Sequence, residues 1–116
     1  MKESEFILVF VTTGSAPEAE CIAEALVSER LAACVNIVPQ VDSVFRWEGR
    51  IDRAREVLLI IKTTRAAISA LIPAVRRLHP YDVPEVIALP IVRGLPAYLA
   101  WVGKSVSRRP ARRAAS

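Results

Sequence analysis

The chain alternates between apolar runs of strand length and amphipathic stretches of helix length. Phe6–Thr13 and residues 57–64 are nearly continuous β-branched, aliphatic and aromatic runs, a pattern typical of strands buried on both faces. Cys34–Trp47 is extended with an interruption at Pro39-Gln40, and residues 86–92 form a last apolar run. These four segments predict four strands.

The stretches between the strands predict helices. Ser15 and Glu18 have the spacing of a capping box, with Pro17 in the first turn, so a helix is expected to start there and continue to about Arg30. Its inner face would carry Ala19, Ile22, Ala23 and Leu26. Residues 65–78 repeat the helical pattern with Ile68, Leu71, Ile72, Val75 and Leu78.

Proline refines both the helices and the sheet. Pro73 lies inside the second helical pattern and should kink that helix or delay its start, because it removes a backbone donor. Pro39 and Pro90 lie in the second and fourth predicted strands, and proline is confined to edge strands or bulges. The first and third strands should therefore be central, which predicts an antiparallel sheet of order 4-1-3-2.

The element order β-α-β-β-α-β predicts an α+β, ferredoxin-like fold. Glu48-Gly49-Arg50 has the composition of a turn, and residues 51–56 are polar enough to protrude, so the second and third strands should form a long hairpin. Val41, Ser43, Phe45 and Trp47 would share one face of it by period-two alternation. Residues 96–103, with Tyr98 and Trp101, predict a short C-terminal helix.

Composition adds an expectation of self-association. The chain has 116 residues, 53% of them hydrophobic, with a mean hydropathy of +0.32. No uninterrupted apolar run approaches the roughly 18 residues of a membrane span. A subunit interface is the simplest cover for this apolar excess.

The N-terminus and the cysteines indicate where the protein is located. The charged first five residues do not resemble a signal peptide. Cys21 and Cys34 lack metal-site spacing, so we expect free thiols and a cytoplasmic location.

The net charge of +4 comes from the C-terminus. Five of the 16 basic residues and no acidic residue follow Gly103, so the body, residues 1–103, is slightly acidic. We expect one domain over 1–103 and a basic, disordered tail over 104–116. Without exposed aromatics on the central strands or a basic body, no nucleic-acid partner is expected.

The connector before the last strand contains the chain's only histidine. His79, Tyr81, Asp82 and Glu85 lie within a few residues, and Pro80 and Pro84 stiffen the run between them. Such a segment can hold the polar groups of a site in place, or it can be an ordinary helix-to-strand turn. His79 itself is either structural, at a helix C-terminus, or a ligand completed by a neighbouring subunit.

Lys62 and Cys34 are two further candidates for a functional site. Lys62 interrupts an apolar central strand and must reach solvent or a carboxylate, for which Glu85 is a candidate. Lys62, Trp47, His79, Tyr81 and Glu85 would then form a polar and aromatic cleft at a subunit boundary, or a salt bridge that fixes the oligomer. Cys34 is a packing residue unless the fold brings it near His79, where the pair could bind a soft metal.

Four motifs together resemble one family. The segments concerned are residues 29–37 (ERLAACVNI), 45–51 (FRWEGRI), 61–63 (IKT) and 79–85 (HPYDVPE) followed by 87–90 (IALP). Their sequence and order are similar to those of the CutA family of divalent-cation tolerance proteins, from about Ile7 to Trp101. The resemblance implies a ferredoxin-like homotrimer in which the long hairpin wraps a neighbouring subunit, cytoplasmic location, and an association with copper and other divalent cations.

The resemblance also implies a metal site that this chain carries only in part. Where copper ligands have been assigned in a family member, they are a cysteine near the end of the first strand and two adjacent histidines before Pro-Tyr. The corresponding residues here are Thr12, Leu78 and His79, so only His79 remains as a donor. A lone imidazole is a poor site for copper or another divalent cation, because such ions take two or more N or S ligands.

Several functions stay open at this point. With no nucleotide-binding loop, nucleophile elbow or zinc-protease motif, we expect no enzyme. The leading interpretation is a non-enzymatic trimer linked to divalent-cation tolerance. The alternatives are a trimeric signalling module that binds a small anionic metabolite between subunits, through Lys62 or hairpin residues such as Arg46, Arg50 and Arg53, and a scaffold that binds no small ligand.

Overall fold

A computed structural model describes residues 5–107 of the chain. Its elements follow the order β1 (Phe6–Thr13), α1 (Ala16–Ser28), β2 (Cys34–Trp47), β3 (Arg50–Thr64), a 3₁₀ turn (Arg65–Ala67), α2 (Ile68–Leu78), β4 (Val86–Pro90) and α3 (Pro96–Ser105). The predicted β-α-β-β-α-β order with a C-terminal helix is confirmed. Most of the expected basic tail lies outside the described residues.

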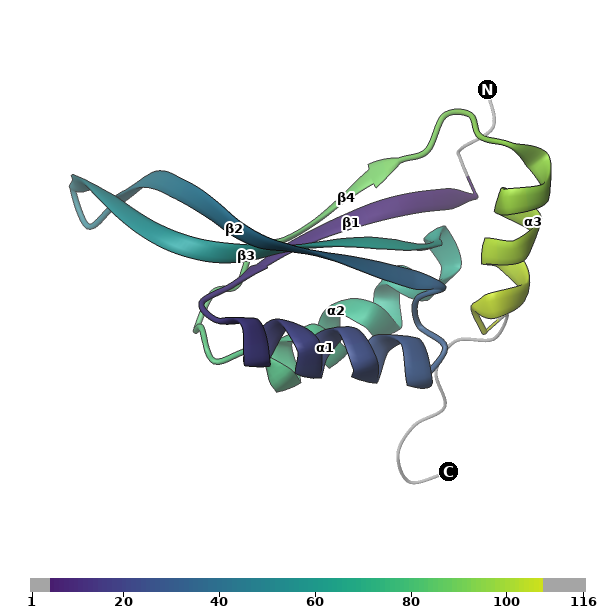
Figure 1. Cartoon of the computed structure of the whole chain (residues 1–116), viewed down its shortest axis with the longest axis horizontal. Helices are drawn as coiled ribbons and strands as arrows, with labels where there is room; N and C mark the ends of the chain where they lie inside the picture. Colours follow the sequence, from purple (N-terminus) through teal and green to yellow (C-terminus); the bar gives the residue numbers. More distant parts are fainter. Residues whose placement is uncertain (1–4, 108–116) are drawn as a thin grey trace.

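The four strands form one antiparallel sheet of order β2-β3-β1-β4. This is the predicted order, and Pro39 and Pro90 do lie in its two edge strands. Helices α1 and α2 cover one face of the sheet, while α3 lies at the end away from the hairpin tip (Figure 1). On the opposite face, α3 packs only against the end near Phe6 and Cys34, and no helix lies over the rest.

The hairpin of β2 and β3 projects well past the rest of the sheet (Figure 1). Its register runs from Cys34 opposite Lys62 to Trp47 opposite Arg50, with a shift between Val38 and Val41, where Pro39-Gln40 interrupts the pairing. Such a bulge increases the local twist. At the tip, Glu48 and Gly49 have φ values of 49° and 82°, which make the two-residue turn that matches a twisted hairpin.

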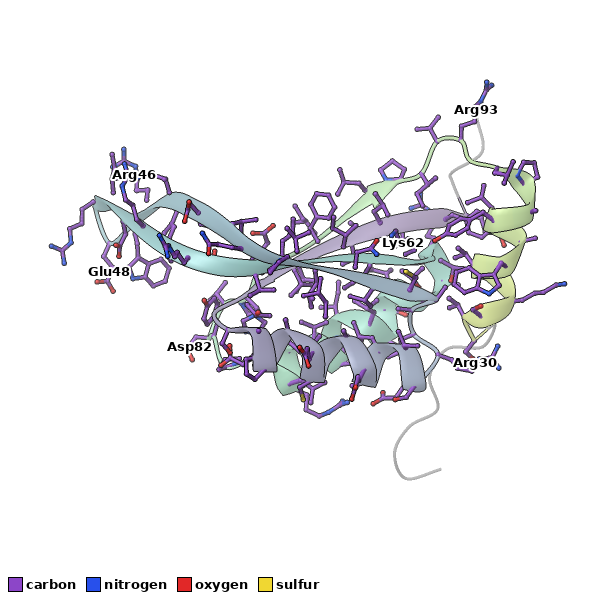
Figure 2. The ribbon with its side chains drawn as sticks, viewed as in Figure 1. Arg30, Arg46, Glu48, Lys62, Asp82 and Arg93 are labelled. Carbon is purple, nitrogen blue, oxygen red and sulfur yellow. The ribbon has the colours of Figure 1, made fainter. Side chains whose placement is uncertain are left out.

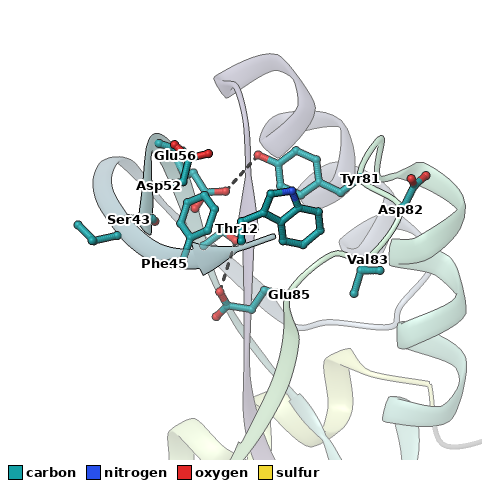
Figure 3. Close-up of a pocket in the computed structure, with 12 residues that line it drawn as sticks. Thr12, Ser43, Phe45, Asp52, Glu56, Tyr81, Asp82, Val83 and Glu85 are labelled. Atoms are coloured by element: carbon teal, nitrogen blue, oxygen red, sulfur yellow. Dashed lines mark hydrogen bonds between the residues drawn. The ribbon is translucent and has the colours of Figure 1, made fainter. Parts of the chain in front are cut away.

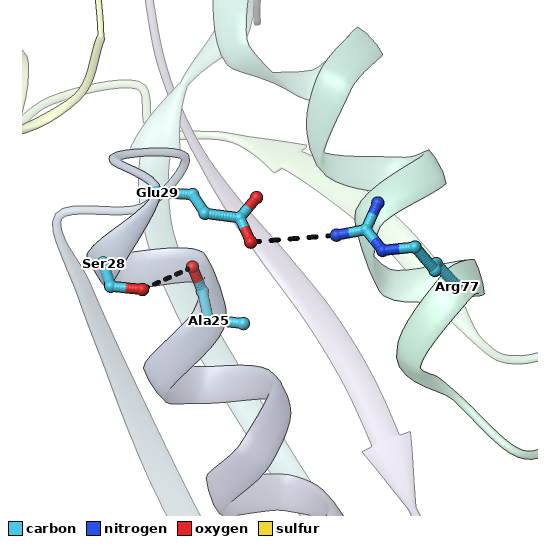
Figure 4. Close-up of polar contacts among 4 residues, drawn as sticks. All are labelled: Ala25, Ser28, Glu29 and Arg77. Carbon is cyan, nitrogen blue, oxygen red and sulfur yellow. Dashed lines mark hydrogen bonds and ion pairs between the residues drawn. The ribbon is translucent and has the colours of Figure 1, made fainter. Parts of the chain in front are cut away.

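The core lies between the sheet and the two covering helices. Val9, Val11, Leu59 and Ile61 point from the central strands toward α1 and α2, and each is at most 1% exposed. The helices contribute the predicted inner-face residues of α1 and, from α2, Leu71, Ala74 and Val75. An exposed ion pair between Glu29 and Arg77, 3.7 Å apart, joins the ends of the two helices (Figure 4).

The predicted capping of α1 is present on the serine side. Ser15 is the N-cap, and its hydroxyl oxygen accepts a hydrogen bond from the backbone N–H of Glu18. The helix ends at Ser28 rather than Arg30, because Arg30 takes a positive φ of 61° while Leu31 bonds back to the carbonyl of Leu26.

Several expectations need correction. The central strands are covered on one face only, since both helices lie on the same side of the sheet. Pro73 lies inside α2, which begins only at Ile68 after the 3₁₀ turn, and Ile72 is exposed. Strand β4 stops at Pro90, opposite Ile7, rather than at Val92, and beyond it only the backbone N–H of Ile91 still bonds to the carbonyl of Phe6. Helix α3 continues past residue 103 to Ser105, and Val106 is buried behind it.

Candidate functional site

The segment after α2 folds back against the end of β1. Helix α2 ends at Leu78, and His79 takes an extended conformation with φ −93° and ψ 133°, as a residue before proline should. This turn carries the His79 side chain into the protein, where it is 7% exposed. The sequence therefore places its only imidazole in a buried position beside the sheet.

Both ring nitrogens of His79 make hydrogen bonds to backbone groups. Nε2 lies 2.7 Å from the carbonyl oxygen of Thr12, and Nδ1 lies 3.1 Å from the backbone N–H of Tyr81. A carbonyl only accepts and an N–H only donates, so Nε2 carries the proton and Nδ1 is the acceptor. This arrangement favours the structural interpretation of His79, because neither nitrogen offers a free lone pair to a metal ion.

Tyr81 connects the same segment to the hairpin. The centroid of its ring lies 4.6 Å from the centroid of the His79 ring. Its hydroxyl donates a hydrogen bond to Oε2 of Glu56 at 3.1 Å. Burial, the hydrogen bond to Glu56 and the charges of Glu56 and Glu18 raise the pKa of Tyr81 above its ordinary value, in that order of importance. Tyr81 is thus held as a neutral donor.

A cleft of about 700 Å³ opens between the outer half of the hairpin, residues 43–47 and 52–56, and the segment after α2. Figure 3 shows Tyr81 and Glu56 meeting across it, with Phe45, Thr12 and Glu85 nearby. Its lining comes from β1, both hairpin strands and the connector to β4: Thr12, Ser43, Val44, Phe45, Trp47, Asp52, Ala54, Glu56, Tyr81, Asp82, Val83 and Glu85.

The cleft is acidic. Asp52, Glu56, Asp82 and Glu85 line it, whereas no lysine or arginine does. Glu85 accepts a long hydrogen bond of 3.5 Å from the hydroxyl of Thr12, and Asp52 accepts one from the backbone N–H of Arg53. Within residues 5–107, none of the four carboxylates is in an ion pair. Their negative charge is uncompensated and is available to attract a cation.

Lys62 and Cys34 do not belong to this cleft. Lys62 lies opposite Leu8, four residues along β1 from Thr12, which corresponds to roughly 13 Å. Its ammonium group contacts Asn36 and, at 4.0 Å, the sulfur of Cys34, rather than Glu85. Figure 2 shows Lys62 toward the α3 end of the sheet and Asp82 below the hairpin. The possible thiol–imidazole pair of Cys34 and His79 is therefore not formed.

The Lys62 cluster is completed by α3. Burial, followed by the electrostatic effect and the side-chain hydrogen bond of the neighbouring Cys34, raises the pKa of Tyr98. The Tyr98 ring lies 5.5 Å from that of Trp101. The structure thus divides the predicted site residues into two groups. Trp47, Tyr81 and Glu85 line the cleft with His79 behind them, and Cys34 and Lys62 lie elsewhere.

Sequence reasoning missed several lining residues. Phe45 could have been found, because period-two alternation already placed it beside Trp47. Asp52 and Glu56 belong to residues 51–56, which the sequence indicates only as a polar segment that protrudes from the sheet. Their position follows from the hairpin register, which places Asp52 opposite Phe45.

The donor set does not match a preformed metal centre. Over the part of the chain that the structure describes, no three His, Cys, Asp or Glu side chains converge closely enough to hold an ion. The positions that the resemblance relates to copper ligands are occupied by Thr12, which bonds to Glu85, by the partly buried Leu78, and by His79, whose two ring nitrogens both make hydrogen bonds. These three residues do not fit a copper ion.

The sheet order, the long hairpin and the C-terminal helix define an α+β protein of the ferredoxin-like class. Residues 7–105 match the family model described as CutA1 divalent ion tolerance protein. The chain is 50% identical over 95 residues to the divalent-cation tolerance protein CutA of Thermus thermophilus, which covers 82% of this chain and 92% of that one. The chain therefore belongs to the CutA1 divalent ion tolerance family.

Solved structures agree with this assignment. CutA1 of Thermus thermophilus superposes with a TM-score of 0.87 at 47% identity, covering 88% of this chain and 99% of that one. CutA1 of Oryza sativa superposes with a TM-score of 0.88 at 45% identity, covering 92% of this chain and 98% of that one.

Some curated relatives are longer than this chain. The chain spans 64% of the length of a CutA homologue of Xenopus laevis and 52% of the length of mouse CutA. Among the described residues, no helix is long and apolar enough to cross a membrane.

Proposed function

We propose that this chain is a non-enzymatic, cytoplasmic homotrimer that serves divalent-cation tolerance, and that cations are attracted to its acidic cleft. The observation that carries the proposal is the set of four carboxylates around a cleft of about 700 Å³ without a basic side chain. A concave surface of one charge focuses its field and raises the local concentration of counter-ions. The printed names of the relatives, which are tolerance proteins, support the same function.

Assembly is supported by the uncovered face of the sheet. The register places Phe10 opposite both Ile60 and Ile87, on the face without helices, and Ile87 and Leu89 are 50% and 38% exposed. Leu8 and Leu58 on the same face are only partly buried. An apolar face of this extent favours a subunit interface. The number of three subunits, with the hairpin wrapping a neighbour, is proposed from the family resemblance.

The negative charge of the cleft argues against the alternative of a signalling module that binds an anionic metabolite. An anionic metabolite would meet Asp52, Glu56, Asp82 and Glu85 with no basic side chain in the lining. Lys62, one of the basic residues named for that alternative, is held by Asn36 on another part of the sheet, and Arg46, Arg50 and Arg53 do not line the cleft. The engaged nitrogens of His79 likewise support a role without catalysis, because the ring has no free lone pair to act as a base.

A cytoplasmic location is supported by the two free cysteines, Cys21 and Cys34, in the described chain. The family itself occupies several compartments. One relative from Arabidopsis thaliana is named as chloroplastic, and a solved structure from Archaeoglobus fulgidus is named as periplasmic. Subcellular fractionation with an antibody to the untagged protein would test the assignment for this chain.

The test of cation binding is calorimetric titration of the reduced protein with Cu²⁺, Zn²⁺ and Cu⁺. The double variant Asp82→Asn/Glu85→Gln removes two cleft charges, and Glu20→Gln removes an exposed charge on α1 as a matched control. Because the described residues form no preformed metal centre, we expect weak binding that strengthens at low ionic strength, that the double variant weakens and that the control leaves unchanged. Equal affinity in all three proteins would contradict the proposal. Light scattering on the same samples tests the trimer separately.

A further inference from the structure

Helix α3 packs on a small hydrophobic cluster of its own. Val102 on α3 and Val106 just after it are fully buried, and they form a cluster with Ala33 and Ala67, against which Phe6 packs. None of these residues belongs to the main core between the sheet and helices α1 and α2. The other residues of α3 are half-buried or exposed. An element with so few buried apolar contacts can open without disturbing the main core.

A polar contact from Arg30 holds the C-terminal end of α3. The guanidinium donates to two carbonyl oxygens of the last turn, from Nη2 to Lys104 at 2.5 Å and from Nε to Ser105 at 3.3 Å. The Arg30 carbonyl accepts a hydrogen bond from the backbone N–H of Ser107 at 2.9 Å. Carbonyls at a helix C-terminus lack partners within the helix, and the helix dipole attracts a cation there. Arg30 thus caps a helix that lies 74 positions further along the chain (Figure 2).

The backbone conformation of Arg30 points to the same role. Its φ of 61° lies in the left-handed region, which favours glycine and strains a residue with a side chain. Arg30 also follows the end of α1, a position where glycine is the common residue. A glycine there could not reach α3. The contact with α3 therefore gives a reason for arginine at a position whose backbone favours glycine.

Helix α3 also contacts the pair formed by Lys62 and Cys34. The Lys62 ammonium lies 4.0 Å from the Cys34 sulfur, and the side chain of Tyr98 on α3 hydrogen-bonds with the same thiol. Cys34 is half-buried in this arrangement, whereas Cys21 on α1 is exposed. All these contacts lie within one protomer, at the end of the sheet away from the hairpin tip (Figure 1). Movement of α3 would therefore change the exposure of Cys34.

We infer that residues 96–107 form a strap that opens as a unit, that Arg30 holds it closed, and that its release exposes the thiol of Cys34. Without the guanidinium, only the small cluster around Val102 holds the helix. A detached helix of 10 residues is marginal in water, so the strap unwinds when it opens. The sheet and the main core stay intact. The inference goes beyond the proposed function, because it involves no residue of the acidic cleft.

The test compares Arg30→Gly with Arg77→Gln in the assembled, full-length protein. Glycine removes the guanidinium at a φ that favours glycine, so the turn itself is not weakened. Arg77→Gln removes an exposed guanidinium that pairs with Glu29 instead of α3, and it is the matched control. In Arg30→Gly, hydrogen exchange in α3 should be about tenfold or more faster, with β1 and β3 unchanged. The control should exchange like the parent.

Thiol alkylation is the second readout. Mass spectrometry of peptides gives separate rates for the labelling of Cys34 and Cys21 by iodoacetamide. In Arg30→Gly, we expect Cys34 to be labelled about fivefold or more faster than in the parent, with Cys21 unchanged. Val102→Ala, which weakens the hydrophobic cluster and leaves Arg30 in place, should change both readouts in the same direction.

Three outcomes would overturn the inference. The first is unchanged exchange of α3 in Arg30→Gly. The second is an equal acceleration in α3 and β1, which would mean that α3 opens only when the whole protein unfolds. The third is labelling of Cys34 that does not rise relative to Cys21. The proposed function fails on other measurements, through unchanged metal binding in Asp82→Asn/Glu85→Gln or through a monomer in light scattering.

Discussion

The Nε2 atom of His79 lies 2.7 Å from the carbonyl oxygen of Thr12, across 67 positions of sequence. This contact ties the end of β1 to the start of the segment that forms one wall of the cleft. Together with the Tyr81 N–H bond to Nδ1, it makes the imidazole a bridge between backbone groups. The side chain that most suggested chemistry in the sequence is therefore a positioning residue for Tyr81.

Replacing His79 tests this role. His79→Ala removes a buried ring and two hydrogen bonds, so the free energy of unfolding should fall by about 2–4 kcal/mol in urea denaturation at fixed protomer concentration. Nitrogen NMR of the intact protein should show the neutral tautomer with its proton on Nε2. A loss below about 0.5 kcal/mol, or the opposite tautomer, would contradict the bridging role.

The raised pKa of Tyr81 predicts that the stability of the fold changes at alkaline pH. Its pKa is raised in the folded state, mainly by burial and then by Glu56, so folding disfavours the phenolate. This contribution to stability is fully present below the ordinary pKa of 10.0 and is lost as pH rises through the folded-state value. Stability should therefore decline above about pH 10. Tyr81→Phe should make that decline shallower, as measured by thermal unfolding across an alkaline pH series.

Tyr98 is a second contributor to the same alkaline decline. Its pKa is also raised, by burial and by Cys34, so Tyr98→Phe should reduce the remaining part of the decline. The double variant should show the weakest alkaline dependence of all. If both single variants keep the full decline of the parent, phenol ionisation is not its cause.

The uncovered face of the sheet predicts a sharp effect on assembly. Ile60 lies opposite Phe10 on that face, and Ile60→Glu would place a charge among apolar neighbours in an interface. We expect this variant to be monomeric in light scattering at micromolar concentration, because an unpaired buried charge is costly. Ile72→Glu, at an exposed position of α2, should leave the oligomeric state of the parent unchanged.

Gly49 tests the hairpin turn. Its φ of 82° favours glycine, although the space around it is open, so Gly49→Ala introduces backbone strain without a steric clash. We expect a loss of about 1 kcal/mol in chemical denaturation, with the fold retained. Gly94→Ala is not a suitable comparison, because its added methyl would meet Leu99 at 3.2 Å. An unchanged stability in Gly49→Ala would indicate a turn of another type.

The sequence determined the fold through features that act locally. The alternation of β2, the Ser15 cap, and the two edge prolines each depend on neighbouring residues, and together they were sufficient for the element order and the sheet order. The end of β4 differs from the prediction, because the apolar run continues to Val92 while the pairing with β1 ends at Pro90 opposite Ile7.

The site was decided by tertiary structure. Tyr81 reaches Glu56 and Thr12 reaches Glu85 only because the hairpin register and the turn after α2 bring distant segments together. The same register places Lys62 beside Asn36 rather than Glu85. Periodicity shows which face a side chain occupies but not what lies opposite, because strand pairing and loop closure join residues dozens of positions apart. The chain's local pattern thus determined its architecture, and long-range packing determined which of its polar residues share a cleft.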